Sequence, residues 1–326
     1  MLLVDSVHGI KMLMKNLVSL YTAILIAAFL SGQAFADENA IIRLLSLPEE
    51  KIDVGKTALI IAKDIYPEID VNAYSAKIDA MVSNVRILTK GSSDPDYRIR
   101  ALNTYLYKIV GIKYDFSDPF GKNTKNRYIN GVLDSKRGNC VSIPILYLAI
   151  AQRLGYPVYA VAAPEHLFLR YVDPIFKDQN IEATGGGGYS SDKEYIKNFQ
   201  ISKAGIKSGT YLKTMSHRAL VADMVSQLAG YWIEKGDFRR AIRYLEKCVK
   251  ISPNSAEINS NLGKSYWLYG KTMRLDEAYE YFRKGDFYFK KGKALGLVKL
   301  PQEDYIAEVK RKAMAEAIRN KGGNNE

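Results

Sequence analysis

The sequence predicts an α+β domain followed by an all-α domain. Apolar residues recur at helical spacing through residues 37–112, and a further apolar helix is expected over residues 143–154. Patterns typical of short β-strands come next, at residues 158–162, 167–172 and 180–184. From about residue 212 the pattern is helical again. Helices that lead into short antiparallel strands are typical of α+β folds, and the last third of the chain is expected to be all helical.

The first helices have recognisable start signals. Asp53 is a candidate N-cap for the second helix, and Asp70 and Asn72 precede the third. A fourth helix is expected over residues 97–112, and a turn-rich stretch follows at residues 115–126. The first domain is therefore expected to place several helices before its strands.

The C-terminal third contains a helical repeat with tetratricopeptide spacing. Pro253 and Ala241 fit the late proline and the small-residue positions of a 34-residue repeat, and Leu262-Gly263 fits the same pattern in a second copy. Such helix pairs bury their apolar faces against neighbouring pairs. We therefore expect residues 213–230 and a helix at about residues 302–320 to cap the two copies, or the first domain to dock there.

The composition is that of a basic globular protein. The chain has 326 residues, of which 47% are hydrophobic and 25% charged, and this suggests about two folded domains and excludes a disordered chain. The formal net charge is +12, yet no run of Lys and Arg resembles a nucleic-acid-binding arm. We expect no nucleic-acid partner, and a basic surface is suited to peripheral contact with an anionic envelope surface.

The N-terminus has the pattern of a secretory signal peptide. Lys11 and Lys15 precede the apolar run Leu17–Leu30, and Ala34-Phe35-Ala36 supplies a small-x-small cleavage site. We therefore expect export by the signal peptide to the periplasm or outside the cell, with an uncleaved anchor as the alternative. The expected parts of the chain are a signal peptide at residues 1–36, a first domain at residues 37–210 and a helical domain at residues 211–326.

Cys140 is the first candidate catalytic residue. It follows Arg137-Gly138-Asn139 and precedes an apolar helix, and Pro144 is tolerated only in the first turn of that helix. Unsatisfied backbone N–H groups and the positive end of the dipole at a helix start favour a thiolate. A buried structural cysteine is the alternative. Cys248 lies in the other predicted domain, so no disulfide scaffold is expected.

His166 is the second candidate, because it opens a predicted strand. The next strand presents Asn180 and Glu182 on one face. If the two strands form a hairpin that turns near Asp173-Pro174, His166 lies opposite Glu182. A nucleophilic cysteine needs an imidazole partner, and that imidazole needs a third group on its far nitrogen. Glu182 is the expected third group and Asn180 the alternative, while a buried core histidine is the alternative for His166.

Residues from about 53 to 190 resemble the bacterial transglutaminase-like family that is often joined to tetratricopeptide repeats. The stretches that carry the resemblance are Ala58–Tyr74, Tyr128–Leu133, Arg137–Cys140 with the helix through Gly155, Pro164–Arg170, and Asn180–Thr184. The resemblance implies a papain-like core, with Cys140 at the start of the central helix, His166 on the following sheet and Glu182 on the next strand. The wider superfamily usually has Asp before Pro-Thr at the acid position, whereas this chain has Glu182-Ala183-Thr184.

The resemblance also suggests a function. It implies a cysteine enzyme that cleaves or exchanges amide bonds of a protein or peptide through a thioester, with the repeats binding a protein partner. The backbone N–H of Cys140 is one candidate oxyanion donor, and Tyr128 and Asn130 are others. The mature chain has two histidines and two cysteines, which are too few and too scattered for a metal site, so no metal or other cofactor is expected. The alternative is a non-catalytic envelope scaffold or peptide-binding protein that uses its repeats.

Overall fold

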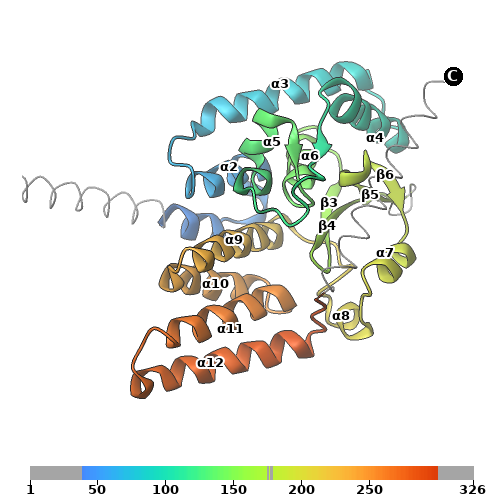
Figure 1. Cartoon of the computed structure of the whole chain (residues 1–326). Helices are drawn as coiled ribbons and strands as arrows, with labels where there is room; N and C mark the ends of the chain where they lie inside the picture. The colour runs from blue at the N-terminus through green and yellow to red at the C-terminus, as the bar shows by residue number, and fades with distance from the viewer. Residues whose placement is uncertain (1–38, 175, 177–178, 300–326) are drawn as a thin grey trace, which may run out of the picture.

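The computed structural model describes residues 39–174, 176 and 179–299. The predicted signal peptide and the predicted helix at residues 302–320 lie outside the described residues. An α+β unit occupies the upper part of Figure 1, and a stack of long helices lies below it. Among the helices of the described residues, none combines the length and the apolarity needed to cross a bilayer.

Helices form the front of the α+β unit, and their capping residues are those predicted. Asp53 accepts a hydrogen bond from the backbone N–H of Lys56 at 2.8 Å, and Asp70 accepts one from Asn72 at 2.9 Å. The predicted helix at residues 97–112 is in fact two pieces, because the α-helix ends at Asn103 and a π-helical turn follows. The elements are a helix at residues 39–45, η1 (Glu49–Lys51), α2 (Val54–Lys63), α3 (Val71–Thr89), α4 (Pro95–Asn103) and η2 (Thr104–Ile109).

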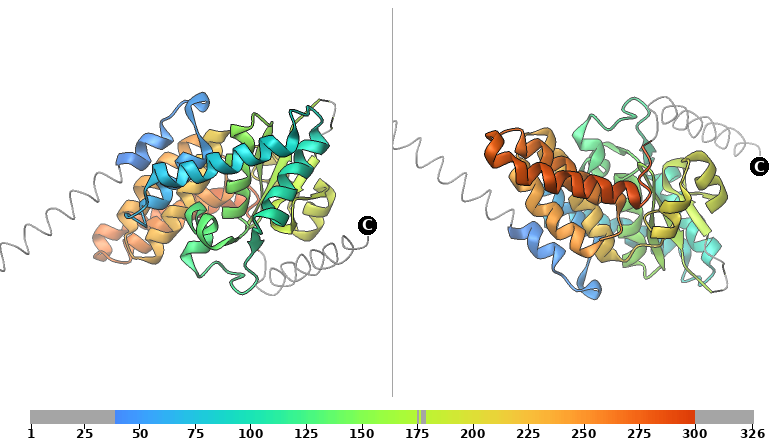
Figure 2. Two further views of the ribbon diagram at one scale, coloured as in Figure 1. Left: turned by 90° about the horizontal axis from the view of Figure 1, so that it is seen from above. Right: turned by 90° about the horizontal axis from the view of Figure 1, so that it is seen from below.

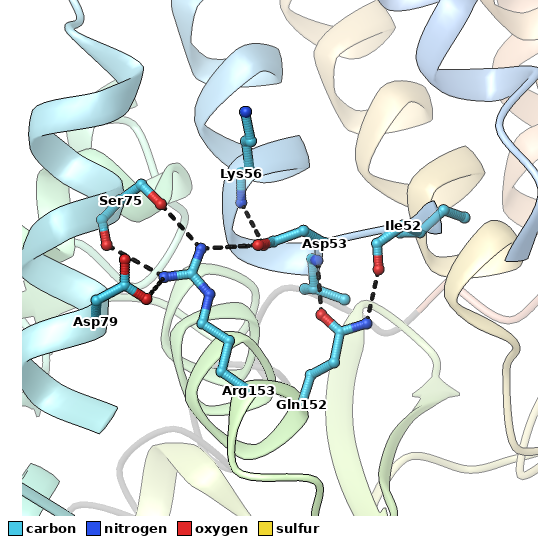
Figure 3. Close-up of polar contacts among 8 residues, drawn as sticks. Ile52, Asp53, Lys56, Ser75, Asp79, Gln152 and Arg153 are labelled. Carbon is cyan, nitrogen blue, oxygen red and sulfur yellow. Dashed lines mark hydrogen bonds and ion pairs between the residues drawn. The ribbon is translucent and has the colours of Figure 1, made fainter. Parts of the chain in front are cut away.

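The central helix α6 (Ser142–Arg153) is buried on nearly every side. Its residues from Ser142 to Ala151 are all buried, because helices pack on one side and the sheet on the other. Gln152 near its C-terminal end accepts from the backbone N–H of Val54 at 2.9 Å, and Arg153 forms ion pairs with Asp53 and Asp79 (Figure 3). These contacts fix the helix to α2 and α3 at the end opposite Cys140. The short elements nearby are β1 (Lys113–Tyr114), η3 (Thr124–Arg127), α5 (Ile129–Ser135) and β2 (Arg137–Gly138).

A four-stranded antiparallel sheet lies against α6. Its strands are hydrogen bonded in chain order, as β3 (Val158–Ala163), β4 (His166–Tyr171), β5 (Gln179–Glu182) and β6 (Gly188–Ser190). The last strand was not predicted, because the four consecutive glycines at residues 185–188 predict a flexible turn. That run forms η4 (Ala183–Gly185) and a tight turn, in which Gly187 has a φ of 76° and its Cβ position lies 2.1 Å from Asn103 Oδ1. α7 (Asp192–Asn198) and α8 (Lys203–Ser208) follow the sheet.

The register between β4 and β5 differs from the predicted one. Leu169 pairs with Ile181 and Arg170 with Asn180, so the hairpin is centred on residue 175 and not on residue 174. Continued along the strands, this register places Thr184, and not Glu182, directly opposite His166. The shift is two residues, and side chains alternate with a period of two. Glu182 therefore keeps the predicted face and lies diagonally across from His166.

The C-terminal helices pack in succession, as Figure 2 shows. They are α9 (His217–Glu234), α10 (Phe238–Ile251), α11 (Ala256–Gly270) and α12 (Leu275–Ala294). Ala241 is fully buried, as the repeat pattern predicted for that position. Gly263 has a steric role, because a Cβ there would lie 2.9 Å from the backbone oxygen of Gly285. The missing side chains let α11 and α12 approach closely.

Candidate active site

Cys140 lies two residues before α6 and is 8% exposed. The first N–H groups of the helix are less open than predicted. The side-chain oxygen of Asn139 accepts from the backbone N–H of Val141 at 2.9 Å and from that of Ser142 at 3.1 Å. The dipole of α6 still points its positive end toward Cys140. Asn139 was quoted in the sequence motif, but its capping role was not predicted.

Gly138 allows the turn before Cys140 to pack tightly. A Cβ at this position would lie 2.6 Å from both the hydroxyl of Ser142 and a methyl group of Val132. That hydroxyl donates to the backbone oxygen of Asn126 at 2.5 Å. Asn126 in turn donates to Asp115 at 2.9 Å. The turn-rich stretch at residues 115–126 therefore packs against the first turn of α6. The sequence predicted turns in this stretch but not its contact with the helix.

A two-residue turn brings the strand of His166 beside Cys140. Ala163 pairs with His166, so only Pro164 and Glu165 connect β3 to β4. Glu165 adopts a φ of 54°, a left-handed conformation that is uncommon for a residue with a side chain. Its backbone oxygen accepts a hydrogen bond from the Cys140 thiol at 3.5 Å. The thiol is thus held next to the first residue of β4.

The structure brings His166 and Glu182 together. His166 Nε2 lies 2.8 Å from Glu182 Oε2, and both side chains are buried. The hydroxyl of Tyr195 donates to the same oxygen at 3.0 Å. Thr184 donates to the other carboxylate oxygen through its backbone N–H at 3.1 Å and also through its hydroxyl. Burial and the charge of Glu182 raise the pKa of Tyr195 well above its ordinary value, so this phenol stays a donor.

Aromatic rings fix the plane of the imidazole. The ring of His166 stacks on Phe199 at a centroid distance of 4.8 Å and an interplanar angle of 14°. Phe168 stacks on Tyr195 in the same way at 3.7 Å. Neither Tyr195 nor Phe199 was predicted. The Ser191-x-x-Glu194 capping box, which the structure contains, marks the start of α7 and was the available signal.

Asn180, the alternative third member, is engaged elsewhere. Its side-chain oxygen accepts from Arg170 Nε at 2.7 Å, and its amide donates to Asp192 at 2.7 Å. Both the oxygen and the nitrogen of this amide are therefore hydrogen bonded to residues other than His166. The geometry favours Glu182 over Asn180 as the residue that orients the imidazole.

Tyr128 and Asn130 are buried at the start of α5. The ring of Tyr128 meets the ring of Tyr66 edge-on at 6.3 Å, and burial raises the pKa of its hydroxyl. The side-chain oxygen of Asn130 is buried with no hydrogen-bond partner in the described part of the chain. The oxyanion role assigned to these two residues and to the Cys140 N–H stays a prediction.

The second cysteine and the second histidine of the mature chain, Cys248 and His217, lie in the helical unit. Cys248 is fully buried and burial raises the pKa of its thiol. Cys140 and Cys248 do not form a disulfide with each other. The backbone N–H of His217 donates to Glu49 at 2.6 Å at the start of α9. Within residues 39–174, 176 and 179–299, no group of three or more His, Cys, Asp or Glu side chains is arranged to hold a metal ion.

A cavity of about 720 Å³ lies beside His166. One wall is the turn between β3 and β4, and the facing wall consists of residues from α9, α11 and the loop before α11. The site therefore opens toward the helical unit.

Comparison with known proteins identifies the domain. Residues 72–226 match the family described as the Transglutaminase-like superfamily (Transglut_core2). A UPF0162 protein of Xylella fastidiosa is 24% identical over 229 residues, which cover 68% of this chain and 80% of that protein. Human F-box only protein 21 is 34% identical over 101 residues, which cover 29% of this chain and 16% of that protein. The solved structure titled "Crystal structure of a TGase" aligns with a TM-score of 0.29 and 19% identity over 38% of this chain and 36% of the other.

Proposed function

We propose, from the transglutaminase-like domain that residues 72–226 form, that this chain is a cysteine enzyme acting on amide or peptide bonds. The observation that carries the proposal is the hydrogen bond of 2.8 Å between His166 Nε2 and Glu182 Oε2. His166 directly follows Glu165, whose backbone oxygen accepts a hydrogen bond from the Cys140 thiol. This arrangement supports the roles of Cys140 as nucleophile, His166 as base and Glu182 as orienting acid in covalent acyl transfer.

The hydrogen bond to Glu182 assigns the two ring nitrogens. Because Nε2 faces the carboxylate, Nδ1 takes the proton of the Cys140 thiol. The thiolate attacks the amide carbon and forms a tetrahedral intermediate. The C–N bond then breaks, and the proton on Nδ1 goes to the leaving amine. Water attacks the resulting thioester in hydrolysis, whereas a second amine attacks it in transamidation, and we favour hydrolysis because water needs no dedicated site.

The remaining parts of the proposal concern location and partners. The pattern of residues 1–36 supports export to the periplasm or outside the cell. The succession of helices α9 to α12 supports tetratricopeptide-type repeats that bind a protein partner. A non-catalytic scaffold with the same repeats is the alternative, and the reactivity of Cys140 separates the two.

The test is the alkylation rate of Cys140 by iodoacetamide near pH 7, followed by mass spectrometry. We expect Cys140 to react about ten-fold or more faster than free cysteine, because a thiolate is the reactive form. The His166→Ala variant is expected to lose this advantage. Cys248 is an internal control, since its burial and raised pKa predict no labelling in the folded protein. A Cys140 thiol that reacts as slowly as free cysteine would contradict the enzyme and favour the scaffold.

A further inference from the structure

The cavity beside His166 is shared by the two units of the molecule. Glu165 and His166 line it from the β3–β4 turn. Asp223 and Gln227 line it from α9. Residues 251–255 line it from the end of α10 and the following loop, and Glu257 and Ile258 line it from the first turn of α11. Its volume of about 720 Å³ is within the range of ligand-binding cavities. A molecule that reaches His166 through this cavity must therefore contact the helical unit.

The wall offers hydrogen-bonding groups to a polypeptide. Ser226, Gln227 and Asn261 lie on the helical side, among apolar residues such as Ile258. Asn261 donates to Ser226 at 3.2 Å, which orients its amide along the wall. Alternating polar and apolar contacts of this kind suit an extended peptide better than a wholly apolar ligand.

Within the described part of the chain, Asp223 and Glu257 accept side-chain hydrogen bonds from neutral donors. Asp223 accepts from the amide of Gln227 at 3.1 Å, and Glu257 accepts from the hydroxyl of Tyr211 at 2.5 Å. Glu165 is the third carboxylate, while the cationic side chain in the lining is that of Lys213. Lys299, outside the lining, also acts on Glu165. Three carboxylates against the ammonium groups of Lys213 and Lys299 leave the cavity negative when the carboxylates are ionised.

Burial shifts the titration of these carboxyl groups. Desolvation raises the pKa of Asp223 to about 6. Desolvation, together with the charges of Asp223 and Glu165, raises the pKa of Glu257 to about 7. Each shift means that burial disfavours the negative charge of the carboxylate. A cationic group placed in the cavity would stabilise that charge.

We propose that this cavity is the substrate site, and that it binds a polypeptide whose Lys or Arg side chain is held by Asp223 of α9 and Glu257 of α11. This inference rests on the proposed function, because the bound polypeptide is a substrate only if Cys140 attacks one of its peptide bonds or carboxamides. Asp223 and Glu257 are then specificity-determining residues contributed by the helical unit.

Binding can be tested without chemistry. Full-length protein with Cys140→Ala is titrated at pH 7.5 with pools of fluorescent decapeptides that carry Lys, norleucine or Glu at one position, and anisotropy is measured. We expect Lys pools to bind at least ten-fold more tightly than norleucine pools, and Glu pools to bind most weakly. Adding Asp223→Asn and Glu257→Gln should reduce the Lys preference to within two-fold. Glu234→Gln, which removes an exposed carboxylate of α9 outside the cavity, should leave the preference unchanged.

The outcomes are decisive in both directions. Equal binding of Lys and norleucine pools, a preference that survives the double substitution, or no binding at all would overturn the proposal. A Lys preference that emerges only in a chain ending at residue 299 would also overturn it, because the cavity would then belong to residues 300–326 of the same chain. Since Cys140 is absent from this assay, its failure is distinct from failure of the alkylation test.

A second measurement needs no substitution in the cavity. Wild-type protein is treated with aminoethyl, methyl and sulfonatoethyl methanethiosulfonates, which are cationic, neutral and anionic, and modification of Cys140 is followed by mass spectrometry. We expect the cationic reagent to react at least ten-fold faster than the anionic one, after normalisation to free cysteine. Equal normalised rates would overturn the proposal. A slow reaction with all three reagents that keeps this order would contradict only the enzymatic role of Cys140.

Discussion

Three residues form hydrogen bonds with the carboxylate of Glu182, and these bonds hold it in place beside His166. Tyr195 and Thr184 donate to it, and His166 Nε2 meets it at 2.8 Å. In the proposed mechanism, the Glu182 carboxylate stabilises the imidazolium that forms when Cys140 gives up its proton. Phe199 keeps the imidazole in the plane that this hydrogen bond needs.

The first prediction concerns this carboxylate. Glu182→Gln keeps the shape of the side chain but removes its charge. A hydrogen bond to a charged group contributes roughly 1.5–3 kcal/mol, which corresponds to about ten-fold to a hundred-fold. We expect the alkylation rate of Cys140 at pH 7 to fall by about that factor, and the pH–rate profile to move to higher pH. Tyr195→Phe should give a smaller fall. If Asn180→Ala, in folded protein, lowers the rate more than Glu182→Gln does, Asn180 and not Glu182 orients the imidazole.

At this scale the sequence predicted that His166 and Glu182 share a face, which their contact confirms, but it did not predict the residues around them. Cys140, His166 and Glu182 were placed by a helix start and by strand alternation, which are local patterns. The register was wrong by two residues, yet the face was right, because alternation has a period of two. Tyr195 and Phe199 could not be predicted, since a small tertiary cluster brings them to His166 and no local pattern encodes it.

The segment from β2 to α6 places the nucleophile by close packing. Gly138 pairs with Tyr114, and its small size leaves room for the Ser142 hydroxyl and for Val132. Asn139 caps the first turn of α6, and Ser142 ties that turn to Asn126. The sequence predicted the helix start from Pro144, but the contacts behind it come from the stretch at residues 115–126, whose turns have no periodic pattern. The position of Cys140 therefore depends on packing that the sequence only partly indicates.

The second prediction compares two glycines. In Gly138→Ala the new methyl group would lie 2.6 Å from Ser142 Oγ, which is bonded and cannot move freely. Overpacking of this kind costs about 1–3 kcal/mol of unfolding free energy. Gly230→Ala is the matched control, because Gly230 lies within α9 and a Cβ there meets nothing within 4 Å. We expect urea denaturation to show a loss for Gly138→Ala and a gain of up to about 1 kcal/mol for Gly230→Ala. Equal stabilities of the two variants would show that the β2–α6 turn accommodates the added methyl group with no loss of unfolding free energy.

The two units of the molecule are joined by a buried ionic contact. Asp64 at the end of α2 forms an ion pair with Arg240 of α10, and both residues are buried. Trp232 donates to the same carboxylate at 2.7 Å, and the guanidinium of Arg240 lies 4.0 Å from the centroid of its ring. Because this contact fixes α9 and α10 to the α+β unit, it also fixes the wall that faces His166. The tertiary pair could not be foreseen, since its partners are 176 residues apart.

The third prediction tests that contact. Asp64→Asn leaves the guanidinium of Arg240 buried without its counter-ion, and removing one partner of such a pair costs about 3–5 kcal/mol. We expect urea unfolding, followed by tryptophan fluorescence, to shift to much lower denaturant. Lys77→Ala, which breaks the half-exposed pair with Asp134, is the control and should cost no more than about 1 kcal/mol. Similar losses in the two variants would mean that the units are held together elsewhere.

The last prediction concerns the pH dependence of stability, and it links the helical unit to the cavity. The pKa of Asp223 is raised from an ordinary 3.8 to about 6, and that of Glu257 from 4.5 to about 7. The folded state therefore holds these protons more tightly than the unfolded state does, and their contribution to stability is full below about pH 4 and lost as the pH rises through 6 to 7. We expect the free energy of unfolding to fall between pH 5 and pH 7.5 by about 1–3 kcal/mol more in the wild type than in Asp223→Asn, measured by urea titration at each pH. Groups that do not interact with Asp223 cancel in that difference, whereas Glu257 loses the charge of Asp223 in the variant and adds to the difference in the same direction. Identical slopes would show that Asp223 titrates normally.

A saturating Lys-containing peptide should flatten the slope of the wild type but not that of the variant, because the bound cation stabilises the negative charge of the buried carboxylate.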